Sequence, residues 1–300
     1  MKVGLIIALS IAAGATAVGV PTGIYLANQL KEPTIDYSGI QTDTYSYDMA
    51  AGRAKYEACG GDYSTLAPED AFNISLDLLS GIDRYRAQGV GEAKALFITQ
   101  EIRSTIVRDG DRYFEESLSA SNSSLSPSCA WRMYQDEDGV SQYQGSMNSG
   151  SYEAATFNEE EALEFDYDAY RERMGRLISD RSIFVVSKKT IIAEESSFGR
   201  EGDGYHLEIT LDPVLSVVNY VKQMVTVSNL PSPPTFNSLS LEMTLDESLY
   251  PVTLTTKESY QADSGMGIQA TVNGSVTTYY DLDGEYAIPS LNEPETYEAR

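Results

Sequence analysis

Hydrophobic and polar residues alternate along several stretches of the chain, which is the pattern of half-buried β-strands. The clearest stretch covers residues 94–121, where "ITQEIRSTIVR" and "RYFEESLS" flank the dipeptide Asp109-Gly110. This dipeptide tolerates positive φ at both central positions of a tight turn, so the stretch predicts a β-hairpin. Residues 130–134 and 140–144, joined by "QDEDG", predict a second hairpin.

Two other stretches repeat their apolar residues every three or four positions, which predicts helices. The first begins at Pro68, a favoured first-turn residue, and ends near Gly81. The second follows Asp166, a side chain suited to cap a helix. Its apolar face is formed by Tyr167, Tyr170, Met174 and Leu177.

Residues 204–224, "GYHLEITLDPVLSVVNYVKQM", change from one periodicity to the other. Alternation places Leu207 and Ile209 on one face of a strand, together with Tyr205 and Leu211, and His206 on the opposite face. Asp212-Pro213 then predicts a helix start, with a cap followed by a first-turn proline. The apolar stripe of this third helix comprises Val214, Val217, Val218, Val221 and Val225.

The remaining apolar segments indicate further strands at residues 182–195, 239–245, 252–260 and 268–282. The chain is therefore rich in strands, with about three helices inserted and no regular alternation of strand and helix. This order predicts an α+β fold with an antiparallel sheet. Because each helix must bury its apolar face, we expect a curved sheet with about three helices on its concave face and a cavity between them.

The amino-terminal residues 3–27 carry no charge. A bilayer core needs about 20 apolar residues as a helix, so residues 1–30 are expected to be a membrane anchor or, alternatively, a cleaved signal peptide. Either reading predicts a cell-membrane or secreted protein with its bulk outside the cytoplasm. Residues 31–64 are expected to be a stalk, 65–290 the folded domain and 291–300 a polar tail.

The net charge narrows the range of partners. The chain has 45 Asp and Glu against 21 Lys and Arg, a formal charge of -24. Such a surface repels phosphate backbones, so nucleic acid is not expected as a partner. The 21 tyrosines, against eight Phe and one Trp, are typical of strands that are half in contact with water.

The two cysteines, Cys59 and Cys129, lie far apart in sequence. In an oxidising compartment they predict one disulfide, and the alternative is two separate buried thiols. No C-x-x-C spacing occurs, so the sequence supports neither a zinc site nor a thioredoxin-type motif. No metal and no cofactor are expected.

Candidate catalytic groups are few. His206 is the single histidine and has no accompanying nucleophile motif such as G-x-S-x-G, so we interpret it as an ordinary strand residue. Glu115-Glu116 and the acidic residues 158–168 could supply the carboxylate pair of a glycoside hydrolase. In a chain this acidic such pairs arise without function, so an enzyme is not expected.

The order of elements from residue 65 to 290 resembles that of the lipoprotein carrier superfamily, which includes LolA, LppX and LprG. The similarity lies in the helices and hairpins, followed by "FNSLSLEMTLDESLYPVTL" and "TTYYDLDGEYAIP". It implies a half-barrel of antiparallel strands closed by helices, with a hydrophobic cavity for acyl chains. No cysteine lies near the end of the apolar segment, so the chain departs from the lipidated members.

These observations predict a non-enzymatic cell-envelope protein that binds an apolar or lipid-like ligand between sheet and helices. Two alternatives are an extracytoplasmic structural or protein-interaction module without a cavity, and a carboxylate-dependent hydrolase. Protein partners, oligomeric state and ligand identity do not follow from the sequence. The residues expected to line the cavity are Val214, Val217, Val218, Val221, Val225, Leu207 and Ile209.

Overall fold

The computed structural model describes residues 35–95, 98–122, 128–147, 155–228, 230, 232–263, 269–295 and 297. It also describes two short antiparallel strands, β1 (Ile11–Ala12) and β2 (Ala15–Thr16). The rest of the expected membrane anchor at residues 1–30 lies outside the described residues. Within the described ranges, each helix is too short or too polar to cross a bilayer.

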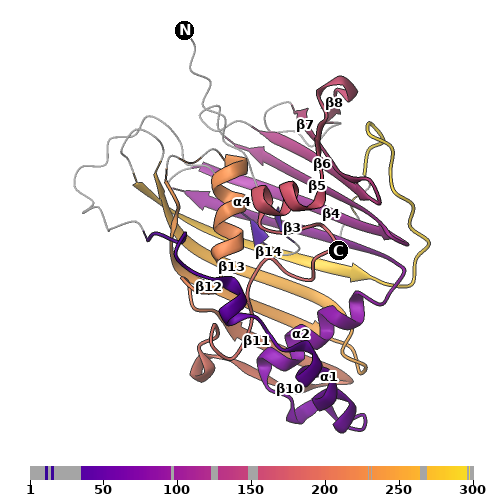
Figure 1. Ribbon diagram of the computed structural model, residues 1–300, viewed down its shortest axis with the longest axis vertical. Helices are drawn as coiled ribbons and strands as arrows, with labels where there is room; N and C mark the ends of the chain where they lie inside the picture. The colour runs from indigo at the N-terminus through magenta and orange to yellow at the C-terminus, as the bar shows by residue number, and fades with distance from the viewer. Residues whose placement is uncertain are drawn as a thin grey trace.

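One open antiparallel sheet of 12 strands dominates the molecule (Figure 1). Its order is β10-β11-β12-β13-β14-β3-β4-β5-β6-β7-β8, with β9 paired to β7. The strands are β3 (Arg84–Ala95), β4 (Ile98–Asp109), β5 (Arg112–Ser121), β6 (Cys129–Asp136), β7 (Gly139–Ser146), β8 (Thr156–Phe157), β9 (Leu163–Phe165), β10 (Ser197–Glu201), β11 (Gly204–Thr210), β12 (Thr235–Leu245), β13 (Pro251–Asp263) and β14 (Gln269–Asp281).

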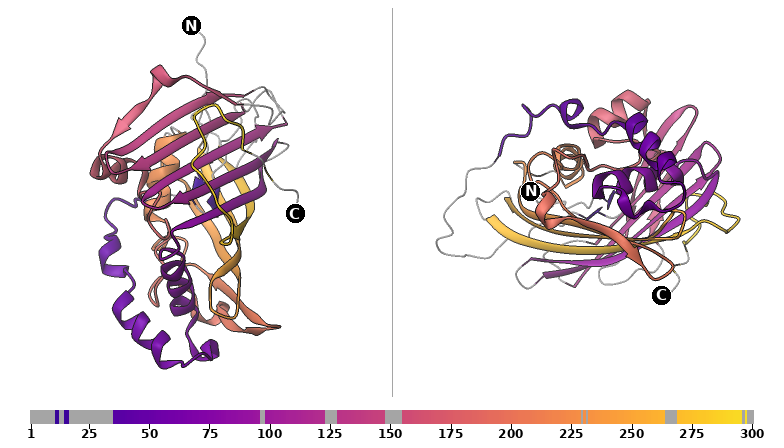
Figure 2. Two further views of the ribbon diagram at one scale, coloured as in Figure 1. Left: turned by 90° about the vertical axis from the view of Figure 1, so that its right-hand side faces the viewer. Right: turned by 90° about the horizontal axis from the view of Figure 1, so that it is seen from below.

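Four α-helices accompany the sheet in the described part of the chain: α1 (Met49–Ala58), α2 (Pro68–Leu79), α3 (Tyr167–Met174) and α4 (Val218–Ser228). The sheet curves, and Figure 2 shows the helices on its concave side. The predicted α+β class and antiparallel sheet are therefore confirmed. Both predicted hairpins are also present, as β4–β5 with Gly110 at φ 66° and as β6–β7.

The β11–β13 half of the concave face is filled by large apolar side chains. Alternation directs Leu207 and Ile209 inward from β11, where both are almost completely buried. Across the β11–β12 register they pair with Met243 and Leu241. α2 lies against β11 and β13 and covers this surface. We call the inward side chains of β11 and β12 the packed half: Leu207, Ile209, Leu239, Leu241 and Met243.

β3 connects the strands β4–β8 to the strands β10–β14 within the sheet. It pairs with β4, its neighbour in sequence, and with β14, the last strand. The sequence did not indicate β3 because Gly89 and Gly91 interrupt its alternation. A Cβ atom at Gly91 would lie 2.1 Å from the carbonyl oxygen of Ser275 on β14. Glycine is therefore required there for the close approach of the β14 backbone.

Residues 182–195, predicted to form a strand, instead form turns with a single bridge between Ile191 and Leu211. The prediction failed because local hydrogen bonds replace the strand ladder. The Thr190 hydroxyl donates to the carbonyl of Val185 at 2.6 Å, and the Ser187 amide donates to that hydroxyl at 2.9 Å. The apolar side chains Ile183, Phe184 and Val186 still reach the core.

The third predicted helix begins later than its sequence signal. Asp212 accepts hydrogen bonds from the amides of Val214 and Leu215, but this cap closes only a turn. α4 itself starts at Val218. The other two helices have the predicted starts: α2 begins at Pro68, and the Asp166 carboxylate accepts from the Ala169 amide to cap α3.

The expected stalk covers residues 31–64, and its described part, residues 35–64, contains α1, which packs against α2. The stacked rings of Tyr56 and Tyr63, 4.9 Å apart, continue onto Tyr205 of β11. The other end of the chain also lies on the sheet. Residues 282–295 and 297, here called the C-terminal segment, cross the strands on the face opposite the helices (Figure 2).

The predicted disulfide is wrong, because Cys59 and Cys129 are not bonded to one another. Cys59 caps the end of α1, and its thiol donates to the carbonyl of Lys55. Cys129 is buried at the start of β6. Figure 1 shows these two elements in separate parts of the molecule, and a disulfide needs Cα atoms within about 7 Å.

Candidate ligand-binding site

β5 reverses the usual distribution of apolar and polar side chains. Its apolar residues Phe114 and Leu118 point to the convex face, where the Arg132 guanidinium lies over Phe114 and the C-terminal segment packs against Leu118. Its polar residues Glu115, Ser117 and Ser119 point to the concave face and are almost completely buried. An inward polar face on a fully buried strand is unusual, because buried polar groups need hydrogen-bond partners.

Hydroxyl side chains on neighbouring strands extend this polar surface. Strand register aligns Thr278, Gly89, Ser104 and Ser117 in one row across β14, β3, β4 and β5. The next row contains Thr256, Val276, Gly91, Ile102 and Ser119. We call the buried hydroxyl residues of these rows the hydroxyl floor: Ser104, Ser117, Ser119, Thr256 and Thr278.

Four of these hydroxyls have no hydrogen-bond partner within the described residues: those of Ser117, Ser119, Thr256 and Thr278. The Trp131 indole N–H, beside Ser117 on β6, also has none there. An unsatisfied buried polar group costs about 1–3 kcal/mol. These hydroxyls therefore lack a partner within the described residues, and water or a ligand could supply one. The short strand β2 contacts β14, one of the strands that carry the floor.

α4 borders the hydroxyl floor. The Tyr220 hydroxyl donates to Glu258 of β13 at 2.9 Å, which holds this helix against the centre of the sheet. One turn along, Gln223 is 2% exposed, and its side-chain oxygen has no partner among the described residues. Polar groups thus face the concave side from both sheet and helix.

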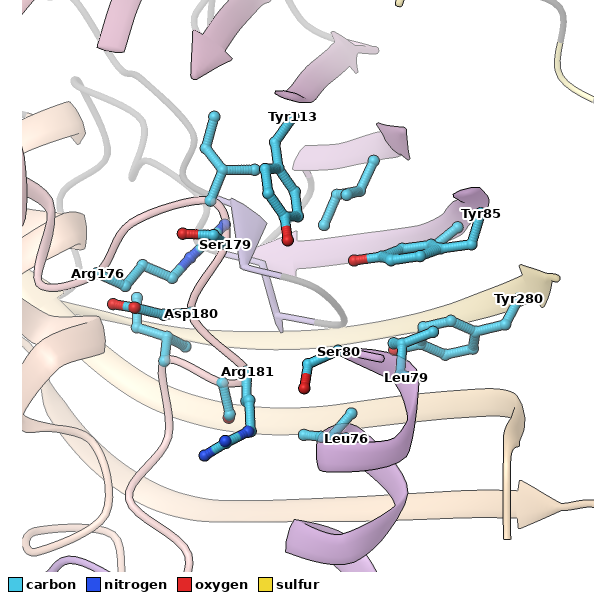
Figure 3. Close-up of a pocket in the computed structure, with 15 residues that line it drawn as sticks. Leu76, Leu79, Ser80, Tyr85, Tyr113, Arg176, Ser179, Asp180, Arg181 and Tyr280 are labelled. Atoms are coloured by element: carbon cyan, nitrogen blue, oxygen red, sulfur yellow. The ribbon is translucent and has the colours of Figure 1, made fainter. Parts of the chain in front are cut away.

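A cavity of about 40 Å³ opens at one end of this region, between α2, the loop after α3 and the strands β3, β4, β5 and β14 (Figure 3). We call it the tyrosine pocket, because Tyr85, Tyr113 and Tyr280 project into it. Its lining residues are Leu76, Leu79, Ser80, Tyr85, Ala87, Ile106, Tyr113, Arg176, Ile178, Ser179, Asp180, Arg181, Ser182, Ile183 and Tyr280.

The tyrosines are held in protonated form. Burial raises the pKa of Tyr85 and of Tyr280 well above the ordinary tyrosine value. Burial also raises the pKa of Tyr113, although the Arg108 guanidinium, 5.3 Å from its ring centre, opposes the shift. All three hydroxyls therefore remain hydrogen-bond donors at neutral pH.

Arg176, which lines the tyrosine pocket, belongs to a buried ion pair. Arg176 Nη2 donates to both carboxylate oxygens of Glu115, at 2.7 and 2.6 Å, and both side chains are at most 5% exposed. Burial raises the pKa of the Glu115 carboxyl, and the arginine opposes this shift. The pair fixes the loop after α3 to the floor of the sheet.

The predicted cavity residues lie beside this region. Val217, Val218, Val221, Leu207 and Ile209 belong to the main core cluster, with 0–4% exposure, and Val214 and Val225 pack against it. None of these seven lines the tyrosine pocket. The hydroxyl floor was not anticipated, although "ESLSAS" in β5 carried the signal: serine occupies every second position.

His206 points to the convex face, with its ring nitrogens 3.5 Å from Glu201 and Glu208. Ligand atoms of His206, Glu208 and Glu242 lie within 4.8 Å of one another, so this group could hold a cation. Both carboxylates are substantially exposed, and Lys257 already bonds Glu242 at 2.8 Å. The arrangement is that of a solvated surface ion-pair network.

The proposed carboxylate pair is separated by the sheet. Glu115 faces Arg176 on the concave side, whereas Glu116 faces Arg132 and the Tyr297 hydroxyl on the convex side. Adjacent strand residues point to opposite faces, so these two groups cannot act on one substrate. In the other acidic region, Glu159, Glu160 and Glu161 are solvent-exposed.

Comparisons with known proteins give only distant similarities. No protein-family model matches the sequence, and no curated protein matches it. Among solved structures, Rv2717c from M. tuberculosis is similar over 67% of this chain and 95% of its own, with 9% identity and a TM-score of 0.21. A dehydratase structure for the borrelidin and fluvirucin polyketide synthases has 14% identity, covers 75% of this chain and 81% of its own, and has a TM-score of 0.14. TM-scores this low assign neither fold nor function.

Proposed function

We propose that the protein binds a lipid-like, amphipathic ligand on the concave face of its sheet and catalyses no reaction on it. The observation that carries the proposal is the hydroxyl floor, where Ser117, Ser119, Thr256 and Thr278 lack partners in the described chain. The rows also contain Val276 and Ile102 between the hydroxyls. Such a mixed surface suits a ligand with both polar and apolar atoms.

The fold supports this proposal, since a curved sheet with helices on its concave side is the arrangement expected for a carrier half-barrel. The packed half supplies the rigid part of the scaffold, and four hydroxyls of the hydroxyl floor have no partner within the described residues. The same proposal includes export: the apolar residues 3–27 direct the domain out of the cytoplasm, as a membrane anchor or a cleaved signal, in a state in which β1 and β2 do not lie against the sheet.

The proposal can be tested with the full chain purified in amphipol, which leaves little free detergent. Organic extraction and mass spectrometry should reveal a co-purifying lipid, and the emptied protein should take up a fluorescent fatty acid. Ser119→Leu inserts a larger side chain into the hydroxyl floor and should weaken this uptake by about tenfold or more.

The matched control is Val90→Leu, because Val90 lies on β3 with 38% exposure and points to the convex face. It should bind the fatty acid as the unmodified chain does. Absence of both co-purified lipid and uptake would refute lipid binding and favour an interaction module. Unchanged uptake by Ser119→Leu would remove the hydroxyl floor from the proposal.

A further inference from the structure

We infer that the tyrosine pocket binds an anionic group, a carboxylate or a phosphate, at the charged end of the ligand. This inference rests on the proposed function, because it assigns one part of the same ligand to one part of the same face. It goes further by naming the chemistry of that part. Four independent features of the pocket lead to it.

The first feature is a buried donor without an acceptor. Tyr280 is 7% exposed, and its hydroxyl has no hydrogen-bond partner in the described part of the chain. Figure 3 shows this side chain in the wall of the pocket, with those of Tyr85 and Tyr113 around the same space. An anionic oxygen would satisfy these donors, since hydrogen bonds to charged acceptors are stronger than neutral ones.

The second feature is a local excess of positive charge. Arg176 is paired with Glu115, and Arg181 with Asp77. Arg108, stacked over Tyr113, instead donates to the backbone carbonyls of Ser80 and Gly110, at 2.6 and 2.9 Å. Those carbonyls carry no charge, so Arg108 has no carboxylate partner among the described residues beside the pocket. In a chain of net charge -24, a positive site is an exception.

The acidic groups near the pocket do not cancel this charge. Asp180 lines the cavity, but its carboxylate accepts from the Leu177 amide at 2.9 Å and from Arg171 at 3.0 Å. The Asp111 carboxylate, in the β4–β5 turn, contributes to raising the pKa of Tyr113. Asp111 is exposed to solvent, which screens its charge. Arg181 uses one guanidinium nitrogen on Asp77, and its remaining N–H groups can donate to a ligand.

The third feature is size. A volume of about 40 Å³ is a few times the roughly 10–15 Å³ that a cavity needs to hold one water molecule. The pocket therefore has room for a small group such as a carboxylate. The fourth feature is the apolar part of the lining, which includes Leu76, Ile106 and Ile178. These side chains suit the methylene groups that follow a ligand's charged end.

A comparison of charged with uncharged ligands tests the inference directly. The full chain is titrated with a long-chain fatty acid, the fatty alcohol of the same length, a short-chain phosphatidic acid and inorganic phosphate. We expect the acid to bind at least about tenfold more tightly than the alcohol. Tyr280→Phe keeps the ring and removes only the hydroxyl, and it should reduce this preference by about fivefold to tenfold.

Tyr279→Phe is the matched control, because Tyr279 neighbours Tyr280 on β14 and points to the opposite face. It should leave the preference unchanged. Equal affinity for acid and alcohol would overturn the anion site and leave lipid binding intact. An equal loss from both tyrosine variants would also overturn it.

The phosphate arm separates this inference from the proposed function. If neither acid nor alcohol binds, the proposed function fails. Inorganic phosphate that binds the full chain, and binds Tyr280→Phe more weakly, would still support the anion site with a free anion as its occupant. If phosphate, phosphatidic acid and fatty acid all fail to bind, the anion site is refuted. Tighter binding of phosphatidic acid than of inorganic phosphate identifies a lipid headgroup as the source of the anion.

Discussion

The packed half and the hydroxyl floor are parts of the same concave face, but they have opposite chemistry. In the packed half, Leu207, Ile209 and Leu241 interdigitate with the helices and have 0–1% exposure. On the hydroxyl floor, Ser117 and Ser119 are equally buried but have no partner in the described residues. Strand alternation decides which face a side chain occupies, and the size and polarity of the side chain decide whether it packs in the core or remains without a partner there.

The largest expected effect on stability comes from a substitution in the packed half. Leu241→Ala should lower the free energy of unfolding by about 2–5 kcal/mol, because it removes apolar contacts and leaves a cavity. Urea denaturation followed by circular dichroism measures the change. Ser240→Ala, on the opposite face of the same strand, should change the stability by less than about 0.5 kcal/mol. Similar effects of both variants would contradict the distinction between the faces.

A smaller effect on stability is expected at Asp77, which links α1 and α2 to the pocket loop. Asp77 of α2 bonds Arg53 of α1 at 2.6 and 2.8 Å, and it bonds Arg181 of the pocket loop at 2.7 Å. Asp77→Asn should lower the free energy of unfolding at neutral pH by about 1 kcal/mol, because these ion pairs are partly exposed to solvent.

The Asp77 effect should depend on pH. Arg53, and to a smaller extent Arg181, lowers the pKa of the Asp77 carboxyl. A lowered folded-state pKa contributes stability that is present above the unfolded-state pKa, about 4, and is lost as the pH falls. The difference between Asp77→Asn and the unmodified protein should therefore shrink progressively as the pH falls below about 4. Asp83→Asn, at an exposed carboxylate, is the control; a pH-independent difference at Asp77 would argue against the ion pairs as the cause.

The smallest expected effect is a gain in stability rather than a loss. Ser117→Ala removes a buried hydroxyl without a partner in the described chain, so the free energy of unfolding should stay the same or rise by up to about 1 kcal/mol. Thermal denaturation of the ligand-free protein measures this. A loss above about 1 kcal/mol would show that the hydroxyl has an internal structural role, which would weaken the contrast between the two regions.

The sequence predicted the strands whose alternation has an apolar inward face, such as β11, and the helices whose capping signal lies at their start, such as α3. It did not reveal β3, because glycine supplies no side chain to the pattern. It also misplaced the start of α4, since the turn at Asp212 has the same cap chemistry as a helix. Only tertiary packing distinguishes the two.

The candidate site was harder to predict than the fold. Alternation in β5 places Phe114 and Leu118 on one face and Glu115 and Ser117 on the other, but it does not predict which of the two faces is turned toward the helices. Leu118 of the apolar set packs against the C-terminal segment, whose residues follow β5 by more than 160 positions. The polar set consequently faces inward. A pattern confined to one strand cannot contain this information.

The pairing of β3 with β14 has a consequence for synthesis. β3 ends at residue 95, and its partner begins at residue 269, so more than half of the chain separates the two. Until the last strand leaves the ribosome, β3 has an open edge that other chains could occupy. We expect the nascent protein to need protection from aggregation, and the sheet to become continuous only after translation ends.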